Sequence, residues 1–159
     1  MIPFFTVVFT PVFGMLVDRK GQGTKWMVLG SCLVFAAHLI IAFAPHGVAM
    51  YGYAGIAMLG IGYSLVPAAM WPSVPKIVPE KNLGTAYSLI YWIQNMGMLL
   101  VPVFVGMVFS HADAGSHEGE MAAAVHAEYI FLALGAVAVA VSLILASSSR
   151  RHPELELDR

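Results

Sequence analysis

The stretch GTAYSLIYWIQNMGMLLVPVFVGMVF, residues 84–109, contains no charged side chain and is rich in large apolar residues. The hydrocarbon layer of a membrane is roughly 30 Å thick and is crossed by about 20 helical residues, so this stretch is long enough to span it. Further apolar stretches occupy residues 1–17, 26–44, 48–71 and 129–146, and the first of them is the shortest. The sequence therefore predicts an all-α fold, a polytopic bundle of five transmembrane helices.

The composition of the chain argues against a soluble globule. Of its 159 residues, 59% are hydrophobic and 11% are charged, and the mean hydropathy is +0.79. Too few polar residues are present to cover a water-facing surface. Strands in a membrane need a closed barrel and alternating polarity, which these stretches lack, so helix is the predicted conformation. A formal net charge of -1 gives no general basic field, which argues against nucleic acid as a partner.

The eight Lys and Arg residues are distributed asymmetrically along the chain. They lie in the polar segments 18–25 and 72–83 and beyond residue 147, whereas segments 45–47 and 110–128 contain none. Cytoplasmic loops of membrane proteins are enriched in Lys and Arg. This pattern predicts that the three basic segments, including the end of the chain, are cytoplasmic. It also predicts that the other two segments and the start of the chain lie on the outer side.

Residues 14–21 read GMLVDRKG, in which Gly14, Asp18, Arg19 and Gly21 fit the pattern G-x-L-x-D-R-x-G. This pattern resembles a signature of the major facilitator superfamily that occurs between helices 2 and 3 and between helices 8 and 9. At such a turn we expect Gly14 to allow close helix approach, Asp18 to pair across the turn and Arg19 to anchor at the headgroups. The basic pair that commonly follows is replaced here by Gln-Gly-Thr at residues 22–24. The alternative interpretation is an ordinary basic loop.

The resemblance also implies which half of a carrier the chain represents. Four apolar stretches follow the motif turn, and the last is followed by a basic segment. This order matches helices 8 to 12 of the superfamily, so helix 7 and the N-terminal half are expected to be missing and to be the partner of this chain. An odd number of helices, a start on the outer side and a short first helix likewise suggest a fragment of a longer protein.

A closer resemblance concerns the third and fourth apolar stretches. Residues 62–65, 71–72, 78–80, 83–87 and 93–95 resemble the major facilitator superfamily domain-containing protein 1 branch, whose animal members are lysosomal dipeptide carriers. The resemblance implies a secondary or facilitative carrier of a small organic solute, with dipeptides first. The short connections suggest a prokaryotic relative, and hence the inner membrane of a bacterium.

One face of the fourth stretch is the candidate substrate surface. Tyr87, Tyr91 and Gln94 recur at helical spacing, and Asn95 flanks them. Gln94 lies about 15 Å from the inner end of its helix, near the bilayer midplane where carriers hold substrate. Phenols and amides can hydrogen-bond a peptide without burying a charge, and Tyr63 of the third stretch joins this set. The alternatives are hydrogen bonds between helices and, for Tyr87, an anchor at the membrane interface.

His38 is the only ionisable side chain predicted deep inside an apolar stretch. It could carry a proton, but a neutral hydrogen bond to a neighbouring helix is the favoured interpretation. No Asp, Glu, Lys or Arg is predicted within the helices, so proton coupling is expected elsewhere or not at all. The segment 110–128 is interpreted as a solvated acidic loop, because its spacings match no metal motif. Its metal-capable residues are His111, Asp113, His117, Glu118, Glu120, His126 and Glu128.

Two other functions compete with a carrier. A membrane interaction protein that transports nothing would use the helices only for packing. A membrane enzyme is not expected, because no nucleophile with a base and no paired carboxylates are predicted within the helices. No cofactor is predicted, and the single cysteine, Cys32, is interpreted as a packing residue.

Overall fold

The computed structural model describes residues 2–45, 48–111, 116–153 and 157–158. The described residues are helical and contain no strand, which confirms the all-α prediction. The helices are α1 (Ile2–Lys20), α2 (Gly23–Phe43), α3 (Ala49–Ile77), the short 3-10 helix η1 (Glu80–Asn82), α4 (Leu83–Ser110) and α5 (His117–Arg151).

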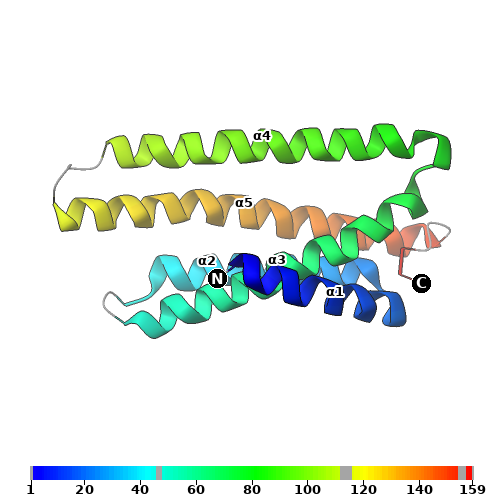
Figure 1. Ribbon diagram of the computed structural model, residues 1–159, viewed down its shortest axis with the longest axis horizontal. Coiled ribbons are helices and arrows are strands. Elements are labelled where there is room, and N and C mark those ends of the chain that lie inside the picture. Colours follow the sequence, from blue (N-terminus) through cyan, green and yellow to red (C-terminus); the bar gives the residue numbers. More distant parts are fainter. Residues whose placement is uncertain (1, 46–47, 112–115, 154–156, 159) are drawn as a thin grey trace.

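The helices form a layered bundle (Figure 1). Helix α2 packs against α3 and α5, and α1 packs against α3. Helix α4 lies along α5 at the edge of the bundle, and none of its residues is buried. Four of the described segments are long and apolar enough to cross a membrane, namely α2, α3, η1 with α4, and α5. Together they make the chain an integral, multi-pass membrane protein.

Glycine brings the backbones of α2 and α3 close together. A Cβ atom on Gly62 would lie 2.9 Å from the carbonyl oxygen of Gly30, and one on Gly30 would lie 2.7 Å from Cγ2 of Val66. The small-residue face of α3 is also buried, since Ser64 is 0% exposed and its hydroxyl donates to the Gly60 carbonyl at 2.7 Å. Small residues every four positions, at Gly60, Ser64 and Ala68, thus let the neighbouring backbone approach closely.

Helices α3 and α5 extend furthest beyond the apolar stretches that predicted them. Helix α3 continues to Ile77, past Pro72 and Pro75. Helix α5 begins at His117, so the prediction of a solvated loop was wrong for residues 117–128. The remainder of that predicted loop includes Asp113, which lies outside the described residues.

The start of α5 has a clear physical cause. The Ser116 hydroxyl accepts a hydrogen bond from the Gly119 amide at 3.0 Å, which satisfies one of the free donors at the helix N-terminus. Glu118 and Glu120 lie in the first turn, where negative charge is favoured by the helix dipole. Hydropathy identifies the apolar part of a helix that lies in lipid. The N-terminus of α5 lies outside that part and is determined by a cap and by charged residues.

The turn between α1 and α2 has an unusual backbone. Gly21 and Gln22 both adopt left-handed conformations, with φ of 62° and 61°. The glycine avoids the steric cost that a side chain would add there. The Gln22 side chain does not cap α2, but the Trp26 indole donates to the Gly21 carbonyl at 3.0 Å.

Asp158 supplies the missing cap from the far end of the sequence. Its carboxylate accepts bonds from the Thr24 amide at 3.1 Å, the Thr24 hydroxyl at 2.7 Å and the Ser149 hydroxyl at 2.9 Å. Its carbonyl oxygen accepts a bond from the Gln22 amide at 3.1 Å. Leu157, beside it, is only 1% exposed. This short segment therefore ties α5 to the turn between α1 and α2.

Candidate functional site

A cavity of about 540 Å³ lies between α2, α3, α4 and α5. Its volume falls in the range of sites that take small organic molecules. Three of the predicted substrate residues, Tyr63, Tyr91 and Gln94, line it. The other lining residues are Ser31, Val34, Val66, Pro67, Met70, Trp71 and Ala138.

Trp71 organises the aromatic side of this cavity. Its ring centroid lies 5.1 Å from that of Tyr91 and 5.6 Å from that of Tyr87, in tilted arrangements. The short η1 connection folds α4 back beside the end of α3, which brings these rings together. Tyr87 thus contacts the site through Trp71 and is not itself a lining residue. Sequence reasoning did not select Trp71, because the helical spacing on α4 says nothing about its partner on α3.

Asn95 is placed differently from its predicted companions. Its side-chain amide donates to the Tyr91 carbonyl at 2.8 Å within α4, and the residue is exposed. It does not line the cavity.

The described lining offers hydrogen bonds without charge. The polar groups are the Ser31 hydroxyl, the phenols of Tyr63 and Tyr91, the Gln94 amide and the indole N–H of Trp71. A primary amide both donates and accepts, so Gln94 matches the two polar groups of a peptide bond. The remaining lining residues are apolar and suit the hydrocarbon part of a solute.

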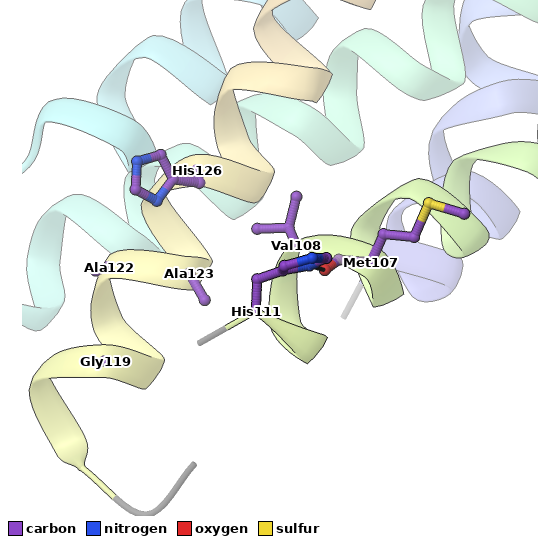
Figure 2. A pocket seen from close by; sticks show the side chains of 7 residues that line it. All are labelled: Met107, Val108, His111, Gly119, Ala122, Ala123 and His126. Carbon is purple, nitrogen blue, oxygen red and sulfur yellow. Dashed lines mark hydrogen bonds between the residues drawn. The ribbon is translucent and has the colours of Figure 1, made fainter. Parts of the chain in front are cut away.

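A second, larger cavity of about 710 Å³ lies where α4 ends and α5 begins (Figure 2). Figure 2 shows its two imidazoles, His111 directly after the end of α4 and His126 on α5. The His111 ring is bonded to the Met107 carbonyl through Nδ1 at 2.7 Å. Two histidines are too few for a closed metal site, and the described residues hold no group of three or more metal-capable side chains. Since none of the predicted substrate residues lies here, the cavity around Gln94 is the better candidate.

His38 has a charged partner that the sequence did not predict. Its Nδ1 lies 2.7 Å from Oε2 of Glu128 on α5, and its ring stacks on Phe131 with centroids 5.1 Å apart. The expected hydrogen bond to a neighbouring helix is confirmed. The apolar stretches themselves contain no acidic residue, as their sequence shows, but α5 begins before its apolar stretch and therefore also carries Glu128.

Comparison with known proteins gives the chain a family. A family model described as Major Facilitator Superfamily matches residues 1–158. The chain belongs to this superfamily. No solved structure matches it.

The superfamily members that resemble the chain include animal proteins named lysosomal dipeptide transporter MFSD1. The human protein is 35% identical over 99 residues, which cover 62% of this chain and 20% of that protein. The chicken protein (Gallus gallus) is 36% identical and the zebrafish protein (Danio rerio) 33% identical, over the same share of this chain and over 22% and 21% of their own lengths. The chain therefore spans about a fifth of the length of these curated relatives.

The segment that resembles a superfamily signature, residues 14–21, lies at the end of α1 and in the turn that follows it. Asp18 and Arg19 are exposed, and Asp18 lines a small cavity of about 140 Å³ together with Lys76 and Leu157. Within the described part of the chain, Asp18 forms no ion pair, so its pairing across the turn stays a prediction. A Cβ atom on Gly14 would meet nothing within 4 Å, so no close approach is seen there among the described residues.

Proposed function

We propose that this chain is part of a transmembrane carrier that moves a small organic solute by alternating access, and that dipeptides are its substrates. The superfamily match and the relatives named as dipeptide transporters support this proposal and favour a carrier over an enzyme. The single observation that carries the site assignment is the uncharged cavity, in which Tyr63, Tyr91 and Gln94 converge from two helices.

The cavity fits the uncharged part of a dipeptide. Gln94 is placed to hydrogen-bond the peptide group, the two phenols add further donors and acceptors, and Trp71 provides an apolar wall. The amino and carboxylate groups of a dipeptide need charged partners when they leave water. Because the cavity lining contains none, we assign those partners to the rest of the carrier.

We further propose that the five long helices are helices 8 to 12 of the superfamily fold, with the N-terminal half and helix 7 completing the carrier. The absence of buried residues on α4 supports this assignment, because a helix that packs so little within its own chain has a surface free for the other half or for lipid. The placement of Lys and Arg supports a cytoplasmic location for the α1–α2 turn, the η1 region and the end of α5. The short connections support the inner membrane of a bacterium, although the relatives are named for the lysosome.

Uptake by proteoliposomes that contain the full-length protein tests this function. We expect labelled dialanine to accumulate and unlabelled dipeptides to compete with it. Gln94→Ala should weaken dipeptide binding several-fold to about tenfold, because a lost neutral hydrogen bond costs about 0.5 to 1.5 kcal/mol. Tyr91→Phe should have a smaller effect, since the ring stays.

Ser88→Ala is the matched control. The Ser88 hydroxyl is exposed on the same helix and donates to the Gly84 carbonyl at 2.8 Å, away from the cavity lining. The proposal predicts unchanged dipeptide affinity in this variant. Equal affinities of wild type and Gln94→Ala would remove Gln94 from the site, and no uptake of any dipeptide would favour the membrane interaction protein.

A further inference from the structure

His38 and Glu128 form a partly shielded titratable pair between α2 and α5. The side chains are 11% and 20% exposed, and the imidazole is covered on one face by Phe131. Both residues can change protonation, and the 2.7 Å contact lets one proton be held between them. We propose that this pair is a proton-binding site of the carrier and that it makes transport depend on pH, an inference that rests on the proposed transport function.

The chemistry of the pair explains why proton uptake matters here. With a neutral imidazole donating its N–H to the carboxylate, the pair carries one net negative charge. One added proton converts the imidazole to imidazolium and brings the net charge to zero. Where water is largely excluded, the free energy of this proton uptake depends strongly on the polar and charged groups around the pair.

The same two helices form the wall of the candidate substrate cavity. Ser31 and Val34 of α2 and Ala138 of α5 line that cavity. His38 follows Val34 by four residues, so it lies on the same face of α2, about 6 Å further along the axis. A movement of α2 against α5 therefore changes both the cavity wall and the surroundings of the pair. Two sites that share such a movement are thermodynamically linked.

Glu128 is the ionisable group that His38 contacts among the described residues, and other rings lie nearby on α2 and α5. On α5, the rings of His126 and Tyr129 lie 6.0 Å apart, and Tyr129 lies 6.3 Å from Phe43. On α3, Gly55 faces this part of α2, because a Cβ atom there would lie 3.3 Å from the Ala37 carbonyl oxygen. The titratable side chains on the neighbouring part of α3 are Tyr51 and Tyr53, and both are exposed.

The test uses the full-length carrier in proteoliposomes, with initial rates of dialanine uptake measured between pH 5.5 and 8.0. We expect the wild-type rate to vary about fivefold or more across this range. The rates of His38→Gln and Glu128→Gln should vary less than about twofold. Both variants can still form a hydrogen bond between α2 and α5, but neither has an imidazole beside a carboxylate to take up the proton. His126→Gln removes a histidine from the same helix without touching the pair and should keep the wild-type profile.

A second measurement separates this inference from the transport function. The apparent Tm of the purified full-length protein is measured over the same pH range for wild type and for both pair variants. A proton-binding pair makes the Tm difference between wild type and each variant change with pH by several degrees, whereas a purely structural hydrogen bond gives a constant difference. Failure of wild type to take up dialanine at any pH would count against the proposed function. The Tm comparison alone would then test whether the pair binds a proton. Pair variants whose pH profile and Tm difference match a structural bond would overturn the proton site.

Discussion

At the residue scale, some side chains of the candidate site could be predicted from the sequence and others could not. Tyr91 and Gln94 share a helical face, so their convergence on one cavity could be predicted from spacing alone. Trp71 could not be predicted in the same way, because its position beside Tyr91 depends on how α4 folds back on α3. Glu128 was missed for a different reason, since it lies before the apolar part of its helix.

The aromatic contacts of Trp71 give a prediction at this scale. Trp71→Ala removes the ring that lies against both Tyr87 and Tyr91. Because Trp71 lines the cavity and lies against Tyr91, its loss removes an apolar wall and the support of a lining phenol, so we expect dipeptide binding to weaken several-fold. Trp71→Phe should recover most of this loss. Isothermal titration of the full-length protein with dialanine measures both, and equal weakening in the two variants would contradict an aromatic role.

A second residue-scale prediction concerns Asp18 at the motif turn. Asp18→Asn should slow transport several-fold while leaving dipeptide affinity nearly unchanged, because the turn lies away from the cavity lining and is expected to act on conformational exchange. Turnover and Kd measured on the same preparation separate the two effects. A variant with wild-type turnover would remove Asp18 from the mechanism.

At the element scale, the helices were predictable as elements but their ends were not. Each long apolar stretch corresponds to one helix, because a spanning segment must satisfy its backbone hydrogen bonds internally. The ends depend on local and distant partners instead. Ser116 caps α5 from the adjacent position, which a capping pattern could have revealed, whereas α2 is capped by Asp158 through contacts 134 residues apart in sequence.

The cap from Asp158 predicts a loss of stability on its removal. Asp158→Ala leaves the Thr24 amide and hydroxyl and the Ser149 hydroxyl without this acceptor. Loss of a helix cap typically costs about 1 to 2 kcal/mol, so the apparent Tm of the purified protein should fall by a few degrees. Glu80→Ala, at another acidic residue on the surface, is the control and should change little. Equal Tm values for both variants would show that the bond contributes nothing to stability.

The contact between α2 and α3 predicts opposite responses at two glycines. Gly62→Ala would place a methyl group 2.9 Å from the Gly30 carbonyl oxygen, which forces the helices apart. Overpacking of this kind costs about 1 to 3 kcal/mol. Gly97→Ala meets nothing within 4 Å and should be neutral or slightly stabilising, because alanine is the better helix former. Thermal unfolding of the two variants side by side is the measurement, and a stable Gly62→Ala protein would refute the close contact.

At the scale of the whole molecule, hydropathy and charge predicted a helical membrane bundle, and both follow from simple solvation. Lipid excludes charges and backbone groups without a hydrogen-bond partner, so a long uncharged stretch that crosses the membrane forms a helix. How the helices pack could not be predicted from the same argument, because lipid tails and apolar side chains are nearly equivalent neighbours. The pairing of α2 with α5 through His38 and Glu128 is one such arrangement.

The proposed orientation predicts a labelling pattern for the full-length protein. With Cys32 replaced by serine, single cysteines at Lys81 and at Glu120, both exposed positions, should react from opposite sides of the membrane. The Lys81 position should be cytoplasmic, because its segment is basic, and the Glu120 position external. Labelling with a membrane-impermeant maleimide before and after permeabilisation measures this. Reaction of both positions from the same side would overturn the proposed topology.

The length of α5 has a practical consequence for imaging this protein. Its 35 residues extend roughly 52 Å at 1.5 Å per residue, which is well beyond a hydrocarbon layer of roughly 30 Å. Helix α5 must therefore tilt in the membrane or project from it into water. The beginning of α5 is fixed by the Ser116 cap and by the hydrogen bond between His38 and Glu128. A helical domain fused in register to the start of α5 would inherit a defined direction. Such a fusion would serve as an alignment marker for electron cryomicroscopy of this membrane protein.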